Sequence, residues 1–138
     1  ENENRRWLSS PNKWNVIDQE HIDVMNKVPN VVDVHNVLKS MGAYKAPGDD
    51  GFPTIFFQRQ WDNVKTQIYE AIVSIWNAPE LISGINSTLL VLIPKVMNPE
   101  LVAQFRPISL CSVIYKVVTK IIVQKLKPVT EAIISPFQ

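Results

Sequence analysis

The chain has 138 residues, of which 46% are hydrophobic and 20% charged, and its formal net charge is +1. This length can bury one modest core, and this composition excludes the low-hydrophobicity class of disordered proteins. The single cysteine, Cys111, excludes a disulfide framework and a cysteine-based zinc site, and the sequence shows neither a long apolar run nor a charged-then-apolar leader. We therefore expect an intracellular protein of one domain or part of one, excised from a longer chain, with no membrane contact.

The first 30 residues are polar, rich in asparagine and interrupted by Pro11 and Pro29. No sustained hydrophobic period runs through them. We expect residues 1–30 to form a loosely ordered lead-in that contains one short helix around Gln19–Lys27.

Apolar residues recur at helical spacing from Val31 onward. Asn30 is available as the N-cap, and Gly42 is placed to end this helix in a left-handed turn. The segment Pro47–Pro53 is a loop by its chemistry, because proline fixes φ and glycine permits positive φ.

A long amphipathic helix is predicted over Thr54–Trp76, followed by a connection over residues 77–87. Its apolar positions step by three and four residues: Phe57, Trp61, Val64, Ile68, Ile72 and Ile75. Leu89–Ile93 is a run of five apolar residues with turn signals on both sides. This run predicts a strand that is buried on both faces and stopped by Pro94.

The last long element is predicted to be a helix that begins after Pro107 and is broken or restarted at Pro128. Its apolar face holds Leu110, Ile114, Val117, Val118, Ile121 and Ile122, and its polar face holds Lys116, Lys120, Gln124 and Lys127. Residues 95–138 carry six Lys or Arg against two Asp or Glu, so a polyanion is expected at this end of the chain. Lys116, Lys120 and Lys127 are therefore candidate nucleic-acid contacts, with a solvated helix face as the alternative.

Lys95 follows the predicted strand directly, and Arg106 comes eleven residues later. If the two segments return side by side, the two cations converge, and this pairing suits a triphosphate. Lysine supplies a point charge, and arginine a bidentate fork. The alternative is a pair of solvated loop charges.

Three sequence blocks carry a family resemblance: Lys45–Phe52, Leu89–Lys95 and Phe105–Leu110. In this order and at this separation they resemble the start of the reverse transcriptase domain of plant non-LTR (LINE-type) retrotransposons. The resemblance implies an α+β fold for residues 31–138, a partial right-hand polymerase with the fingers and the start of the palm. Such a piece would be mostly helical, with a short buried strand or hairpin.

The resemblance also implies that Lys95 and Arg106 contact the phosphates of an incoming dNTP. The implied partners are an RNA template, a DNA primer and the missing palm and thumb segments of the same polyprotein, with access to the nucleus. The complete polymerase would need Mg²⁺, but its aspartate motifs lie beyond residue 138. We therefore assign this chain no catalytic residue, metal ligand or cofactor, and we expect it to be inactive alone.

Asp49 and Asp50 are adjacent, but they lie in a glycine-flanked loop. The family pattern there is Lys-Ala-Pro-Gly-Pro-Asp-Gly, so Asp50 matches as a turn or cap residue and Asp49 replaces a proline. His21 and His35 have no metal-ligand spacing and are expected on a surface or helix face. Two alternatives to a polymerase fragment are a non-catalytic retroelement relic and a maturase-like RNA-binding or interaction module.

Overall fold

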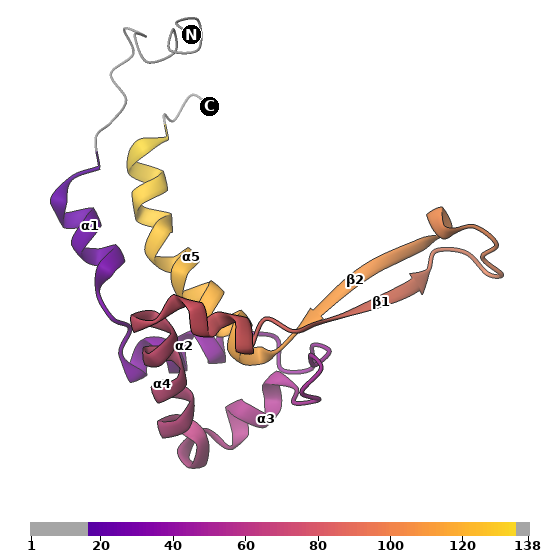
Figure 1. The fold of residues 1–138 in the computed structure, drawn as a ribbon, viewed down its shortest axis with the longest axis horizontal. Coiled ribbons are helices and arrows are strands. Elements are labelled where there is room, and N and C mark those ends of the chain that lie inside the picture. Colours follow the sequence, from indigo (N-terminus) through magenta and orange to yellow (C-terminus); the bar gives the residue numbers. More distant parts are fainter. Residues whose placement is uncertain (1–16, 135–138) are drawn as a thin grey trace, which may run out of the picture. The chain divides into compact units, whose positions relative to one another are not determined.

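The computed structural model describes residues 17–134. Residues 1–16 of the predicted lead-in therefore fall outside the described residues. The chain divides into two compact units: residues 28–122 form one, and the described residues before 28 and after 122 belong to the other. Figure 1 shows the elements, and each unit is described by itself.

The smaller unit contains helix α1, Gln19–Asn26, and the last part of helix α5, Val113–Ile133. Asp18 caps α1, because its carboxylate accepts hydrogen bonds from the backbone N–H and the ring of His21. These bonds hold the pKa of Asp18 below its ordinary value. The ammonium of Lys125 donates to the carbonyl oxygens of Val24, at 2.9 Å, and Lys27, at the end of α1. The short helix predicted around Gln19–Lys27 is confirmed.

The larger unit begins with helix α2, Val31–Lys39. Asn30 is its N-cap, as predicted, in a reciprocal capping box with Asp33 in which both hydrogen bonds measure 2.9 Å. The predicted left-handed end at Gly42 is wrong, because the cap is Ser40 in a right-handed conformation. The side-chain amide of Gln58 donates to the carbonyls of Leu38 and Met41, at 2.9 and 3.0 Å. Gln58 comes 20 and 17 residues after them in the sequence, so a distant residue provides hydrogen bonds to carbonyl groups at the end of α2.

Two helices replace the single helix predicted over Thr54–Trp76: α3, Thr54–Arg59, and α4, Trp61–Asn77. Gln60 separates them, with φ −97° and ψ 16°. A 3₁₀-helix, Pro79–Gly84, follows in the predicted connection. The apolar spacing continues across Gln60, so the hydrophobic period alone does not reveal this interruption.

The core of the larger unit packs side chains of α2, α3, α4 and the start of α5 together. Its buried members are Val34, Val37, Leu38, Met41, Phe57, Trp61, Ile68, Ile72, Ile75, Val113, Val117, Val118 and Ile121. Most of the apolar positions predicted for the helices are among them. The helical periods therefore identified the buried faces correctly.

Helix α5 differs from its prediction at both ends. It begins at Val113, because residues 105–111 form a strand, and Leu110 therefore does not belong to its apolar face. It also continues through Pro128 to Ile133, whereas a break or restart was predicted. Proline removes one helical hydrogen bond, and a long helix can absorb that loss by bending rather than by ending.

His35 lies on α2 with its ring stacked on that of Trp61, at a centroid distance of 4.5 Å and an interplanar angle of 2°. Burial against this neighbour is the main cause that lowers the pKa of His35 below its ordinary value of 6.5. The positive charges of Lys39 and Lys65 lower the pKa further, and Asp62 opposes them. The predicted helix-face role of His35 is confirmed.

Candidate functional site

Strands β1, Thr88–Pro94, and β2, Phe105–Cys111, pair antiparallel as a hairpin (Figure 1). Leu90 pairs with Ser109, and Ile93 pairs with Arg106. The ten-residue connection is ordered by Gln104, whose side-chain oxygen accepts hydrogen bonds from the N–H groups of Glu100, at 2.7 Å, and Leu101, at 2.9 Å. The block with Lys95 and the block with Arg106 therefore lie side by side.

Lys95 and Arg106 are diagonal neighbours at the loop end of this hairpin. The N–H of Lys95 donates to the carbonyl of Gln104 at 2.7 Å, which extends the ladder by one bond beyond β1. Lys95 comes two residues after Ile93, and Ile93 is paired with Arg106, so strand alternation assigns both cations to the same face. Diagonal neighbours of this kind lie about 7–8 Å apart, within reach of long side chains.

Both cations are accessible. The ammonium of Lys95 donates one hydrogen bond, to the carbonyl of Ala103 at 2.9 Å, and keeps two further donors. Arg106 is exposed on β2. Neither residue forms an ion pair with a carboxylate among residues 17–134. Their charge is therefore available to an anionic ligand.

The strand predicted as buried on both faces is exposed on both. Leu90 is 63% exposed, Leu92 52% and Leu89 48%, and these side chains alternate between the two faces. An apolar run predicts a strand, but it does not say whether other elements cover that strand. Cys111 is partly exposed at the end of β2.

The Pro47–Pro53 loop is a loop, as predicted, and it packs against the start of α5. Gly48 is buried, and a Cβ atom on it would lie 2.5 Å from the backbone nitrogen of Ser112. The Asp50 carboxylate accepts a hydrogen bond from the N–H of Phe52 at 3.1 Å, across Gly51 with φ +71°. Asp50 is thus the turn residue that the sequence predicted.

Mg²⁺ ligands are not assembled in the described part of the chain. Residues 17–134 contain no group of three or more His, Cys, Asp or Glu side chains that could hold a metal ion. The Asp50 carboxylate accepts the hydrogen bond from the N–H of Phe52 in the turn, and Asp49 beside it is exposed. These residues therefore do not fit the metal that a complete polymerase would need.

The three lysines predicted along α5 are not equivalent. The ammonium of Lys116 donates to the carbonyl of Ala46 at 3.4 Å, and that of Lys120 donates to the Ser40 hydroxyl at 3.1 Å. Lys127 belongs to the other compact unit and lies 3.7 Å from the Glu131 carboxylate. The structure brings Lys116 and Lys120 together around one pocket and pairs Lys127 elsewhere.

Sequence reasoning missed Lys45 as a member of this pocket. Lys45 lines it beside Lys116 and Lys120, with Ser40, Met41, Gly42 and Thr119 as the other lining residues. Lys45 lies about 70 residues before Lys116 in the chain, and hydrophobic periodicity does not predict contacts over that separation.

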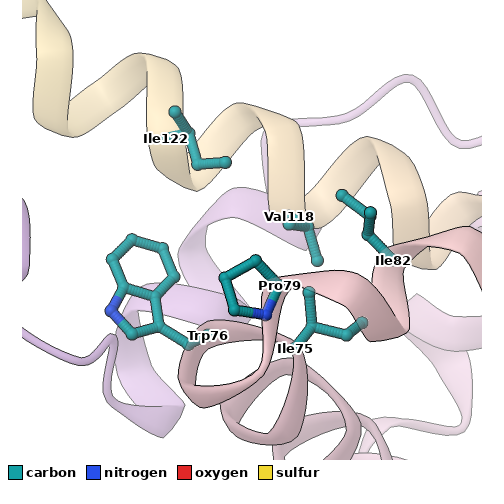
Figure 2. A pocket seen from close by; sticks show the side chains of 6 residues that line it. All are labelled: Ile75, Trp76, Pro79, Ile82, Val118 and Ile122. Atoms are coloured by element: carbon teal, nitrogen blue, oxygen red, sulfur yellow. The ribbon is translucent and has the colours of Figure 1, made fainter.

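A second pocket of about 270 Å³ lies where the 3₁₀-helix meets α4 and α5 (Figure 2). Its lining side chains are Ile75, Trp76, Pro79, Ile82, Val118 and Ile122. None of these six side chains is charged, and five of them contain no polar side-chain atom. This pocket therefore presents no charged side chain to a ligand. Within residues 17–134, no helix has the length and apolar character needed to cross a membrane.

The chain is similar to a transposon protein, whereas no protein-family model matches it. Over 106 residues, 77% of this chain, the sequence is 33% identical to the Transposon TX1 uncharacterized 149 kDa protein of Xenopus laevis. The chain spans about 8% of the length of that relative. The match supports a retroelement-derived fragment, while the plant origin and the reverse transcriptase assignment stay predictions.

Proposed function

We propose that this chain is part of the reverse transcriptase domain of a non-LTR retrotransposon protein. In this proposal, Lys95 and Arg106 contact the triphosphate of the incoming dNTP. Three sequence blocks in the order and spacing of that family support the assignment, and so does the identity to a transposon protein over 77% of the chain.

The observation that carries the proposal is the register of the β1–β2 hairpin. It sets Lys95 and Arg106 one diagonal step apart, exposed and without a carboxylate partner among the described residues. A triphosphate presents several anionic oxygens to such a pair. Arginine can bind two of them at once with its planar fork, and lysine can bind another as a mobile point charge.

In the proposed parent reaction, a primer 3′-hydroxyl attacks the α-phosphate of the dNTP, and pyrophosphate leaves. Mg²⁺ in the complete polymerase would stabilise the charge on the attacking and leaving oxygens. Residues 17–134 do not assemble such a metal site. Their part is to hold the triphosphate in line, which contributes positioning rather than bond making.

The test requires a complete polymerase that contains this segment. Arg106→Ala and Lys95→Ala should each lower kcat/KM for dNTP by about ten- to a hundredfold or more, because each removes a charge-assisted contact of roughly 1.5–3 kcal/mol. Arg106→Lys should restore only part of kcat/KM, because an ammonium group cannot make the two parallel hydrogen bonds of a guanidinium group. Lys65→Ala is the matched control, since Lys65 is on α4 and pairs with Asp62 at 3.3 Å.

Affinity for the primer–template should change little in the Arg106 and Lys95 variants. Normal dNTP kinetics together with a collapse of template binding would assign the two residues to the template path and refute the triphosphate contact. The isolated 138-residue chain should incorporate no dNTP with Mg²⁺, primer and template. Incorporation by that chain would contradict the assignment of the catalytic aspartates to a later segment.

A further inference from the structure

The β1–β2 hairpin has two edges without a partner strand. Among residues 17–134, β1 and β2 form a sheet of two strands, so each strand is paired on one side only. Figure 1 shows the hairpin extending away from helices α2 and α4 of the same unit. An isolated two-stranded hairpin is only marginally stable in water, and additional strands stabilise it. The hairpin therefore gains stability from a strand that pairs with one of its edges.

The register shows which backbone groups lie on each edge. The N–H of Lys95 donates to the carbonyl of Gln104, so these two residues form a hydrogen-bonded pair just beyond β1. Hydrogen-bonded and non-hydrogen-bonded pairs alternate along an antiparallel ladder. Counting back from Lys95, the even-numbered residues of β1 belong to non-hydrogen-bonded pairs. Their N–H and C=O groups therefore point away from β2, toward the open edge.

The two edges of the hairpin differ in their donors. On β1, the outward N–H groups belong to Thr88, Leu90 and Leu92, which form an unbroken row. On β2, the corresponding row includes Pro107, which has no N–H and interrupts it. Proline on an edge strand protects that edge against pairing with a further strand. The β1 edge is therefore the one that can accept another strand.

The sequence of β1 is complementary to itself in the antiparallel direction. With a two-fold axis at Leu90, Leu90 faces Leu90 of a second copy, and Leu92 faces Thr88 of that copy. All three outward N–H groups then meet a carbonyl group of the other strand. No residue of β1 is charged, and Leu90 and Leu92 are exposed, so the facing side chains attract without charge repulsion. The nearest cation, Lys95, lies at opposite ends of the paired strands in the two copies.

We propose that two copies of this chain dimerise through their β1 edges and form a four-stranded antiparallel sheet in the order β2–β1–β1–β2. Both copies use the same surface, as a two-fold interface requires, and main-chain hydrogen bonds join them by strand addition. The outer edges of this sheet are the β2 edges, which Pro107 interrupts, so the assembly stops at two copies. The dimer is independent of the proposed function, because neither Lys95 nor Arg106 is on β1.

Sedimentation equilibrium of the full 138-residue chain tests the dimer over a broad series of protein concentrations. The chain should show a monomer–dimer equilibrium. Leu90→Pro removes one outward N–H from each copy at the two-fold axis, whereas the hydrogen bonds between β1 and β2 keep their donors. The dissociation constant should rise roughly tenfold or more, because the interface loses two hydrogen bonds.

Ser109→Pro is the matched control for Leu90→Pro. Ser109 pairs with Leu90 across the hairpin, so its N–H points outward on the opposite edge. The proline is therefore introduced at the same level of the hairpin but outside the interface, and the dissociation constant should stay unchanged. Circular dichroism at 222 nm should show the same helix content in both variants.

Leu90→Lys and Ser109→Lys test the interface without proline, in case proline disturbs the hairpin. Leu90→Lys places two like charges opposite each other at the two-fold axis, so it should weaken the dimer at about 0.1 M salt and recover part of the affinity at about 1 M. Ser109→Lys adds the same charge where the two copies are three strand spacings apart, about 14 Å, which exceeds the Debye length at 0.1 M salt. Its effect on the dissociation constant should be small.

Disulfide cross-linking tests the register of the two strands. In a Cys111→Ser background, Leu90→Cys should give a disulfide-linked dimer on mild oxidation, because facing Cα atoms lie about 5.5 Å apart. Ser109→Cys in the same background should stay unlinked, because its two thiols are too far apart.

Three results would refute the dimer. A monomer at every concentration would exclude a second copy as the occupant and leave the β1 edge to a strand from elsewhere in a longer parent protein. Equal weakening by Leu90→Pro and Ser109→Pro would show that the β1 edge is not the interface. Association that continues beyond two copies would contradict the protection of the β2 edge by Pro107. The dNTP contact proposed for Lys95 and Arg106 stands or falls separately, because its test measures polymerase kinetics.

Discussion

Gly48→Ala tests how the Pro47–Pro53 loop is anchored to the rest of the fold. A Cβ atom on Gly48 would lie 2.5 Å from the backbone nitrogen of Ser112, 2.6 Å from the carbonyl carbon of Cys111 and 2.8 Å from the Ser112 Cα. Ordinary van der Waals contact begins at 3.4 Å, so the nearest atom is 0.9 Å too close. All three atoms belong to the backbone where β2 ends and α5 is about to begin, so they cannot rotate away as a side chain can.

The expected loss of stability follows from two opposing effects. Overpacking of this kind costs typically about 1–3 kcal/mol, because the backbone must shift. Replacing glycine by alanine restricts the unfolded chain, which returns about 0.4–1 kcal/mol. The free energy of unfolding should therefore fall by about 1–2 kcal/mol for Gly48→Ala.

Urea unfolding of the full chain, followed by circular dichroism at 222 nm, measures this change. With a slope of about 2 kcal/mol per molar urea, the midpoint should fall by roughly 0.5–1 M. Gly84→Ala is the matched control, because a Cβ atom there meets nothing within 4 Å, and its midpoint should stay constant or rise. Gly51→Ala also has open space but a φ of +71°, so its loss should be about 1 kcal/mol from backbone strain alone. A midpoint for Gly48→Ala equal to that of Gly84→Ala would refute the close packing against α5.

The lowered pKa of His35 means that the unfolded chain binds more protons than the folded chain below about pH 6.5, so stability should fall as the pH falls through this range. Urea midpoints at pH 7.5 and 5.5 measure the effect, and His35→Gln should flatten it; an unchanged pH dependence in that variant would assign the effect to other groups. Leu90 is 63% exposed on β1, so Leu90→Thr should change the free energy of unfolding by no more than about 0.5 kcal/mol while it reduces self-association of the chain. Light scattering over a concentration series measures the association, and a large fall in the urea midpoint would show that Leu90 supports the core.

The sequence by itself determined part of the local structure of this chain. The N-cap at Asn30, the loop at Pro47–Pro53 and the strand at Leu89–Ile93 all follow from short-range chemistry: side-chain capping, proline and glycine dihedrals, and β-favouring residues. The helical period also identified the buried face of α4, because one side of a helix repeats every three or four residues. The sequence also shows Lys95 and Arg106 at the two ends of one connection, and their contact with a triphosphate stays a prediction.

Only the tertiary structure decided what covers each element and which distant residues meet. The strand at Leu89–Ile93 is exposed because a two-stranded hairpin has no layer of its own above or below it, which an apolar run does not reveal. Helix α2 is followed by the C-cap Ser40, and Gln58, 20 residues after Leu38, donates to the carbonyls of Leu38 and Met41 at this end. The pocket around Lys45 also depends on the tertiary structure. Lys116 donates to the carbonyl of Ala46 in the loop because α2 and the start of α5 pack in the same core. Such contacts depend on the folded arrangement of whole helices, whereas a sequence pattern records only neighbours a few residues apart.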